Sequence, residues 1–428
     1  MSSLDVAIDP PAAQSLLRFT TAGSVDDGKS TLIGRLLYDA KAVPEDQLAA
    51  LARTAERQGD GAIDLSLLTD GLTAEREQGI TIDVAYRYFA TPRRKFIIAD
   101  TPGHEQYTRN MVTGASTADA AVILVDARKG MTDQTRRHMT LAHLLGIPHL
   151  VVAINKMDLV GYSEATFERH AESISILADA LGIASMRLVP ISAKQGDNVV
   201  HLSQAMTWYR GETLLGILEA LPRAVDLANA AFRFPVQYVT RVPALDGGQS
   251  RRYLGRVESG AVSVGDEIVV LPANVMTRVS AISTFDGALE SAAAPKSIAI
   301  EVADDVDIAR GDILAHVKGK PMVAKSFTAT LCWFGDDSFE PRARYLLRHG
   351  AHMVSARVTE LVHRLDVATQ ELVAKPVTLA RNDIATARIA LQSPLPFDRY
   401  ADNRATGAFI LLDEQTNATV AAGMIDKA

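Results

Sequence analysis

A glycine-rich run near the start of the chain has the residue types of a phosphate-binding loop. It reads Gly23-Ser24-Val25-Asp26-Asp27-Gly28-Lys29-Ser30, followed by Thr31, and matches the pattern G-x-x-x-x-G-K-[ST]. Backbone N–H groups of such a loop wrap a β-phosphate, Lys29 offsets charge between the β- and γ-phosphates, and the Ser30 hydroxyl is suited to Mg²⁺. A chance glycine turn is the alternative, but a strand pattern precedes the loop and a helical pattern follows it. The sequence therefore predicts a nucleotide site here.

A second polar run, Asp100-Thr101-Pro102-Gly103-His104, follows another buried-strand pattern. Ligands collect at the carboxyl edge of an open α/β sheet, which is where this run is expected to lie. Asp100 is then expected to hold Mg²⁺ through water, and the Gly103 N–H to reach a γ-phosphate. Asp-Thr-Pro-Gly can also form a plain turn, so the prediction depends on the phosphate loop beside it.

Two further runs predict which base is bound. Asn155-Lys156-Met157-Asp158 follows an apolar strand pattern, and Ser192-Ala193-Lys194 follows the next one. A carboxylate at Asp158 can accept both the N1–H and the exocyclic amine of guanine, which adenine does not offer. The second run adds a backbone donor for the guanine oxygen. A helix cap is the alternative for the first run alone; in this order, the runs predict GTP.

The segment 75–82, Glu-Arg-Glu-Gln-Gly-Ile-Thr-Ile, lies between the first two runs. Its Thr81 could reach Mg²⁺ only when a γ-phosphate is present, which would make the segment a switch. The alternative is an ordinary loop threonine.

The patterns around these runs predict the elements that position them. Apolar runs at 16–22, 96–99, 120–125, 150–154 and 188–191 alternate with helical segments, which indicates a mostly parallel sheet covered on both faces, with residues 84–89 at an edge. After Pro222 short alternating segments and glycine turns predict two β-barrels. The predicted fold is an α/β P-loop GTPase domain (16–224), after a flexible lead (1–15), followed by all-β barrel domains at 230–325 and 326–428.

The composition indicates several domains in a reducing compartment. Lys and Arg total 44 against 51 Asp and Glu, so a net charge of -7 gives no general attraction to nucleic acid or anionic membrane. The single cysteine, Cys332, cannot form an intrachain disulfide, and neither a signal-peptide pattern nor an apolar run of about 20 residues occurs. We therefore expect a cytoplasmic protein without a nucleic-acid or membrane partner.

With these motifs in order and two barrels behind them, the chain resembles the translation-factor class of GTPases, the class of elongation factor Tu. The resemblance implies that Thr81 and Ser30 bind Mg²⁺ and that His104 orients the attacking water. It also implies that Val25 and Ile80 restrain that histidine as apolar neighbours. The alternative for His104 is a capping or surface histidine, which the adjoining Asp-Thr-Pro-Gly disfavours.

Asp27 narrows the resemblance, because translation factors usually carry histidine there. The run from Gly23, together with residues 74–89, 95–111, 126–138, 232–239 and 307–312, is similar to the CysN family, the GTPase subunit of bacterial sulfate adenylyltransferase. The resemblance implies GTP and Mg²⁺ as ligands and a small partner subunit of the PP-loop ATP pyrophosphatase type. That subunit would make adenylylsulfate and pyrophosphate from ATP and sulfate, driven by GTP hydrolysis here. No Ser-Gly-Gly-x-Asp loop for the ATP chemistry is present. A translation factor that binds tRNA and the ribosome, a self-sufficient enzyme and a higher oligomer stay open.

Other clusters are expected to be structural. The run from His349 to His352 fits a barrel loop better than a nucleotidyltransferase motif, and Asp304, Asp305 and Asp307 fit a solvated turn better than a metal site. Arg93, Arg94 and Lys95 are expected in a solvated hairpin turn. Arg136 and Arg137 are expected on a helix surface, with an arginine finger as the alternative.

Overall fold

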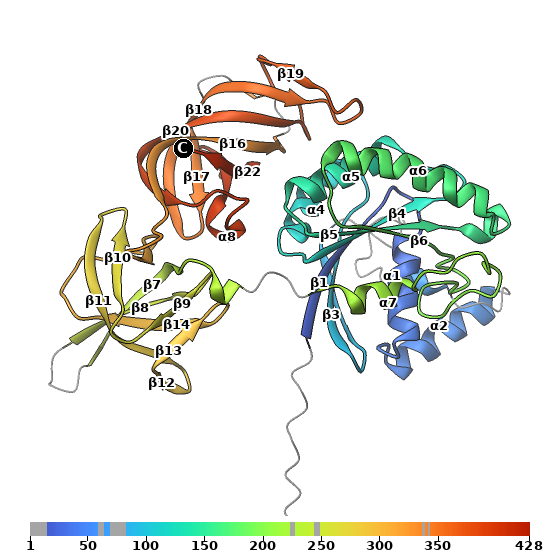
Figure 1. Cartoon of the computed structure of the whole chain (residues 1–428), viewed down its shortest axis with the longest axis horizontal. Coiled ribbons are helices and arrows are strands. Elements are labelled where there is room, and N and C mark those ends of the chain that lie inside the picture. Colours follow the sequence, from blue (N-terminus) through green and yellow to red (C-terminus); the bar gives the residue numbers. More distant parts are fainter. Residues whose placement is uncertain are drawn as a thin grey trace, which may run out of the picture. The chain divides into compact units, whose positions relative to one another are not determined.

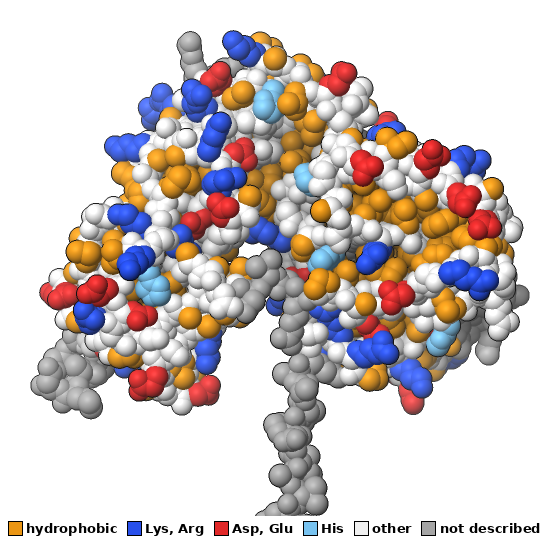
Figure 2. Space-filling model, in the orientation of Figure 1, with side chains coloured by type: hydrophobic (Ala, Val, Ile, Leu, Met, Phe, Trp, Pro, Cys, Tyr) orange, Lys and Arg blue, Asp and Glu red, His pale blue; other side chains and the backbone are white. Residues whose placement is uncertain are grey.

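The computed structural model describes residues 15–58, 64–68, 83–222, 227–243, 249–335, 339–340 and 343–428. The chain divides into two units, Met1–Ala224 and Val225–Ala428 (Figure 1). Lys, Arg, Asp and Glu side chains are interspersed over the visible face of each unit (Figure 2).

A six-stranded sheet forms the centre of the first unit, in the order β2-β3-β1-β4-β5-β6. The strands are β1 (Ser15–Ala22), β2 (Ala85–Ala90), β3 (Arg94–Asp100), β4 (Ala120–Asp126), β5 (His149–Asn155) and β6 (Met186–Pro190). Every residue of β4 is buried, as expected for a central strand covered on both faces. Only β2, at the edge, runs antiparallel to its neighbour. The five buried strands and the edge strand expected from the sequence are confirmed.

Helices cover both faces of this sheet, with α4, α5 and α6 on one side and α1 and α7 on the other (Figure 1). Their bounds are α1 (Lys29–Asp39), α2 (Glu45–Gln58), α4 (Thr108–Ala115), α5 (Asp133–Leu144), α6 (Glu164–Leu181) and α7 (Leu214–Ala220), with short 3-10 turns η1 (Leu65–Leu68), η2 (Glu105–Tyr107) and η3 (Met157–Val160). Leu32, Ile33 and Leu36 of α1 pack on Leu17 and Phe19 of β1 in one apolar core. The phosphate loop between β1 and α1 is therefore fixed at both ends.

The second unit contains two closed β-barrels. The strand order of the first barrel is β10-β15-β7-β8-β14-β11; pairing of β10 with β11 closes it, and β12 extends the sheet. The strand order of the second barrel is β17-β21-β22-β16-β20-β18; pairing of β17 with β18 closes it, and β19 extends the sheet. The first barrel comprises β7 (Arg233–Pro243), β8 (Gln249–Arg256), β10 (Glu267–Leu271), β11 (Val275–Thr284), β12 (Gly287–Leu289), β14 (Ser297–Val302) and β15 (Ile313–His316), after η4 (Leu227–Asn229) and with a small sheet of β9 (Ala261–Ser263) and β13 (Ser291–Ala293). The second comprises β16 (Met322–Trp333), β17 (Tyr345–His349), β18 (His352–Leu365), β19 (Leu372–Ala374), β20 (Ile384–Phe397), β21 (Ala408–Asp413) and β22 (Thr419–Lys427), with α8 (Arg404–Gly407).

A buried ion pair connects the two barrels. Arg233 of β7 donates from Nε and Nη2 to the two oxygens of Asp398, which follows β20, at 2.7 Å each. The two side chains are only 6% and 13% exposed. Asp398 also accepts from the Thr406 hydroxyl at 2.6 Å, and Asn403 Nδ2 donates to Ser259 Oγ at 2.9 Å. These contacts join the barrels by polar groups that are partnered on both sides.

The predicted fold class, an α/β domain followed by two β-barrels, is confirmed. The predicted domain boundaries stay a prediction. The flexible lead predicted at 1–15 lies largely outside the described residues. His349 and His352 pair at the β17–β18 turn, as expected for a barrel loop. The prediction for Arg94 was wrong: its side chain is 2% exposed and donates to the carbonyls of Leu218 and Leu221 at the end of α7. Within the described ranges, no helix is both long and apolar enough to cross a membrane.

Candidate functional site

The phosphate loop joins the end of β1 to the start of α1. Gly28 has φ 91°, a left-handed conformation that favours glycine, and a Cβ there would lie 2.5 Å from Asn155 Nδ2. Within the described part of the chain, no side chain caps the start of α1. The N–H groups of its first turn therefore face the loop without a competing side-chain acceptor, as an anion site at a helix N-terminus requires.

Asp27, the residue that departs from translation factors, lies inside this loop with 2% of its surface exposed. Its carboxylate accepts a hydrogen bond of 2.7 Å from the Ser24 N–H. Burial raises the pKa of the Asp27 carboxyl to about 6. The hydrogen bond from Ser24 acts in the opposite direction, because it favours the charged form. Asp27 therefore fixes the turn of the loop and brings a titratable group next to the phosphate position.

Lys29 and Asp100 form an ion pair across the site. Asp100 ends β3 and stands opposite Thr21 of β1 in the parallel register, so adjacent strands bring the pair together. Ser30 stands next to Lys29 in the first turn of α1, and its hydroxyl has no hydrogen-bond partner among the described residues. A carboxylate and an unpaired hydroxyl beside a phosphate loop are the hard oxygen ligands that Mg²⁺ uses, so the donor set fits the predicted cation.

The loop after Asp100 packs directly on the phosphate loop. A Cβ on Gly103 would collide with the carbonyl oxygen of Gly23, so only glycine allows this approach. Thr101 and Pro102 are buried, and the Thr101 hydroxyl donates to the Thr21 carbonyl at 2.7 Å. These two predicted residues therefore position Gly103 with their side chains turned into the protein.

His104 follows Gly103 and is half-buried. Its Nδ1 accepts a hydrogen bond of 3.2 Å from the Gln106 N–H, and its ring lies 6.1 Å from that of Tyr107. Because Nδ1 is an acceptor, the neutral ring carries its proton on Nε2. His104 can thus donate a hydrogen bond from Nε2. Val25, its predicted apolar neighbour, is 38% exposed.

Asn155 connects three of the predicted loops. Its Nδ2 donates to the Asp27 carbonyl at 2.7 Å, and its Oδ1 accepts from the Ala193 N–H at 2.9 Å. The adjacent Lys156 donates to the Asp26 carbonyl. The loop predicted to read the base is therefore hydrogen-bonded directly to the phosphate loop.

Asp158 and Ser192 lie within hydrogen-bond distance of each other. The Ser192 hydroxyl donates to Asp158 Oδ1 at 2.7 Å. Arg35 of α1 binds the carbonyls of Ala193 and Lys194 at 3.2 and 2.6 Å. Because the Ala193 N–H is already bound to Asn155, the Lys194 N–H is the donor of this loop that has no partner among the described residues. Met157 is fully buried in the core and does not face the site.

Four residues that the sequence analysis did not single out support the site. Asp126 ends β4, and its fully buried side chain forms ion pairs with Lys156 at 3.0 Å and with Arg128 at 2.6 Å. Burial alone would raise the pKa of this carboxyl, but the two cations hold the pKa well below its usual range. Thr132 caps α5 and contacts Ser24 Oγ at 3.0 Å. The stretch 126–138 stood out only as similar to a known family, which gave no role to its individual residues.

Gln134 and His138 of α5 are the other two. Gln134 Nε2 donates to the Gly103 carbonyl at 3.0 Å and lies 3.4 Å from His138 Nε2. Burial, with the charges of Arg137 and Lys29, lowers the pKa of His138 to about 3. The neutral imidazole can therefore accept from Gln134, which orients the amide toward Gly103.

The structure thus brings together four of the predicted runs, at the carboxyl ends of β1, β3, β5 and β6. Thr81 and Ile80, which the resemblance places at Mg²⁺ and beside His104, lie outside the described residues. Among the described residues no group of three His, Cys, Asp or Glu could hold a metal ion, and the interpretation of the cluster around Asp304 as a solvated turn stays a prediction.

Comparisons with known proteins agree with this geometry. Residues 14–212 match the family model of the elongation factor Tu GTP binding domain, and residues 326–426 match that of the GTP-eEF1A C-terminal domain. Sulfate adenylyltransferase subunit 1 of Psychromonas ingrahamii is 51% identical over 414 residues, covering 96% of this chain and 87% of that protein. The subunit of the same name from Chromobacterium violaceum is also 51% identical, over 96% of this chain and 86% of that one. The bifunctional enzyme CysN/CysC of Mycobacterium tuberculosis is 51% identical over 96% of this chain and 67% of its own length.

Proposed function

The chain belongs to the sulfate adenylyltransferase subunit 1 (CysN) family, and from this premise we propose that it hydrolyses GTP to drive the formation of adenylylsulfate. One observation carries the proposal: 51% identity over 96% of the chain with relatives of that name. The four runs at one edge of the sheet support the proposal, since they combine the pattern of a phosphate loop with residues suited to reading guanine.

Nucleotide binding would replace contacts that the site makes within itself. Lys29 and Asp100 now neutralise each other. When GTP and Mg²⁺ bind, Lys29 would turn to the phosphates, and Asp100 and Ser30 are the residues that would hold the cation, which would supply positive charge against the phosphates. The exchange keeps both buried charges paired, so neither state has an uncompensated ion.

His104 would then act by orientation. Its Nδ1 already accepts the Gln106 N–H, so its neutral ring offers Nε2–H to the attacking water as a donor. Phosphoryl transfer depends mainly on placing the water in line with the leaving group, and a fixed donor can do this without removing a proton. Gln134 supports the same loop through the Gly103 carbonyl.

The second half of the proposal concerns the partner. Subunit numbering in the relatives' name implies a second subunit, and we propose that a small subunit of the PP-loop ATP pyrophosphatase type joins sulfate to AMP. A phosphate–sulfate anhydride is steeply unfavourable to form, so its yield is limited unless a second, downhill hydrolysis is coupled to it. GTP hydrolysis in this chain would be that reaction.

GTP turnover by the purified chain tests the proposal, measured alone, with the small subunit and with ribosomes. We expect the small subunit to raise turnover, and ATP, sulfate and GTP together then to give adenylylsulfate. Stimulation by ribosomes alone would support a translation factor instead. Adenylylsulfate formation without the small subunit would support a self-sufficient enzyme.

A further inference from the structure

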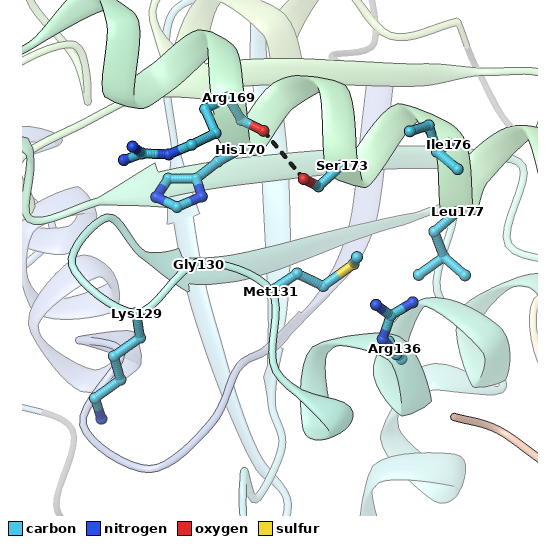
Figure 3. A pocket seen from close by; sticks show the side chains of 9 residues that line it. All are labelled: Lys129, Gly130, Met131, Arg136, Arg169, His170, Ser173, Ile176 and Leu177. Atoms are coloured by element: carbon cyan, nitrogen blue, oxygen red, sulfur yellow. Dashed lines mark hydrogen bonds between the residues drawn. The ribbon is translucent and has the colours of Figure 1, made fainter. Parts of the chain in front are cut away.

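A groove lies between α5 and α6, outside the nucleotide site (Figure 3). Its volume is about 430 Å³. Residues from α6, α5 and the loop after β4 line it: Arg169, His170, Ser173, Ile176, Leu177, Arg136, Lys129, Gly130 and Met131. None of the nine is acidic, although α6 also carries Glu168, Glu172 and Asp179, which are exposed outside the groove.

The charged residues that line the groove are all cationic. Arg136 and Arg169 form no ion pair among the described residues, whereas Arg128 nearby is bound to Asp126. In Figure 3 the Arg136 side chain points into the space between the helices, while that of Lys129 points away from it. Two guanidinium groups without acidic partners favour carboxylates, which they bind by two parallel hydrogen bonds.

The floor of the groove is apolar. Met131 and Leu177 face each other across it, and Ile176 is 65% exposed (Figure 3). Exposed apolar side chains beside arginines are typical of protein interfaces, where Arg and Met are enriched and charged rims surround apolar centres. A small anion would leave the exposed Ile176 uncovered, so the observations favour a protein segment.

The loop that lines the groove is held rigidly to α6. His170 Nε2 donates to the Ala127 carbonyl at 2.9 Å, and a Cβ on Gly130, where φ is 71°, would lie 2.7 Å from the His170 ring. Met131 precedes Thr132, which contacts the phosphate loop at Ser24. An occupant of the groove would therefore contact Met131, and the next residue, Thr132, contacts the phosphate loop.

We infer that this groove, with Arg136 and Arg169 as its charged anchors, docks an acidic segment of the small partner subunit that carries carboxylates and at least one apolar side chain. The inference rests on the proposed function, whose partner it locates on this chain. The basic, partly apolar lining of the groove is the observation that selects an acidic occupant with an apolar side chain. Among the described residues, neither arginine side chain forms a hydrogen bond or ion pair with the nucleotide loops, so we assign them to binding of the partner.

The test is a titration of the small subunit into the full chain while GTP turnover is followed, with binding measured separately by calorimetry. We expect the double variant Arg136→Glu, Arg169→Glu to raise the half-saturating concentration of the small subunit by at least about tenfold, without changing unstimulated turnover or GTP affinity. Arg210→Glu, a reversal at an exposed arginine outside the groove, is the matched control and should behave as wild type.

A neutral double variant, Arg136→Gln, Arg169→Gln, keeps the test valid if the charge reversals prevent folding. This neutral variant should weaken binding of the small subunit less than the charge reversal does. Its binding should also depend less on salt than wild-type binding does, because fewer ion pairs are screened. Binding by either double variant within twofold of the Arg210→Glu control would overturn the inference. Failure of the wild-type chain to bind or respond to the small subunit would instead overturn the proposed function and the inference together.

Discussion

Asn155 Nδ2 donates a hydrogen bond of 2.7 Å to the carbonyl oxygen of Asp27, so the loop proposed to read the base also holds the loop proposed to bind the phosphates. Both groups are buried. In the proposed site, one connected set of loops would therefore recognise both halves of the nucleotide.

Replacing Asn155 by Ala should weaken nucleotide binding and stability together. It leaves the Asp27 carbonyl and the Ala193 N–H without their partners, which costs about 1–3 kcal/mol for each buried group. Equilibrium binding of fluorescent GDP and urea unfolding measure the two effects. Unchanged nucleotide affinity in a folded variant would show that the bridge does not hold the phosphate loop.

The arrangement at this edge was largely predictable from sequence, because each run follows a strand and parallel strands place their ends together. The bonds between the runs were not, since Asn155 to Asp27 and Gln134 to Gly103 join residues far apart in the chain. Arg94 shows the same limit. Its place after a proline predicts a solvated turn, but the end of α7 covers it and offers carbonyls that only the tertiary structure brings there.

Asp27 should make the stability of the nucleotide-free chain depend on pH. Burial raises the pKa of its carboxyl from the usual 3.8 to about 6, so between these values the folded chain holds a proton that the unfolded chain has lost. The contribution of Asp27 to the free energy of unfolding is therefore complete below the unfolded pKa and is lost as the pH rises through 6.

Urea unfolding of wild type and Asp27→Asn at a series of pH values measures this contribution. The amide can keep the Ser24 hydrogen bond but does not titrate, so the variant should show a smaller fall in stability between pH 4 and pH 6. Equal pH dependence in the two proteins would contradict the assignment.

Asp158→Asn should change the preferred base. We expect the carboxylate to accept two donors of guanine. An amide in its place could accept only one of them and would turn its NH₂ toward the exocyclic amine of guanine, whereas xanthine offers an oxygen at that position. We expect GTP affinity to fall by at least about tenfold and xanthosine triphosphate affinity to rise. Competition binding with both nucleotides measures the ratio, and an unchanged ratio would show that Asp158 does not read the base.

Removing the His104 side chain should slow GTP hydrolysis in the complex with the small subunit and leave GTP affinity unchanged. His104→Ala should lose about 100-fold in single-turnover rate. His104→Gln retains an N–H donor and should lose less, because the ring acts from Nε2–H as a donor. Full activity in the alanine variant would exclude the role, and equal losses in the two variants would exclude donation as its basis.

Arg233→Ala should destabilise the two-barrel unit by about 3–5 kcal/mol, since it leaves the buried Asp398 carboxylate without its bidentate partner. Arg251→Ala is the matched control: it removes a pair with Asp305, whose side chain is 89% exposed, and should cost less than about 1 kcal/mol. Chemical unfolding of both variants measures the difference. Equal losses would show that the inter-barrel pair contributes no more than a surface pair.

The most direct measurement of the central claim is the yield of adenylylsulfate from ATP and sulfate by this chain with the small subunit, compared between GTP and a non-hydrolysable GTP analogue. With GTP, we predict that adenylylsulfate accumulates beyond the uncoupled equilibrium, in proportion to the GTP hydrolysed. With the analogue, or with a chain carrying Lys29→Ala, the yield should stay at that equilibrium. An equal yield with the analogue and with GTP would contradict the claim that GTP hydrolysis in this chain drives the reaction.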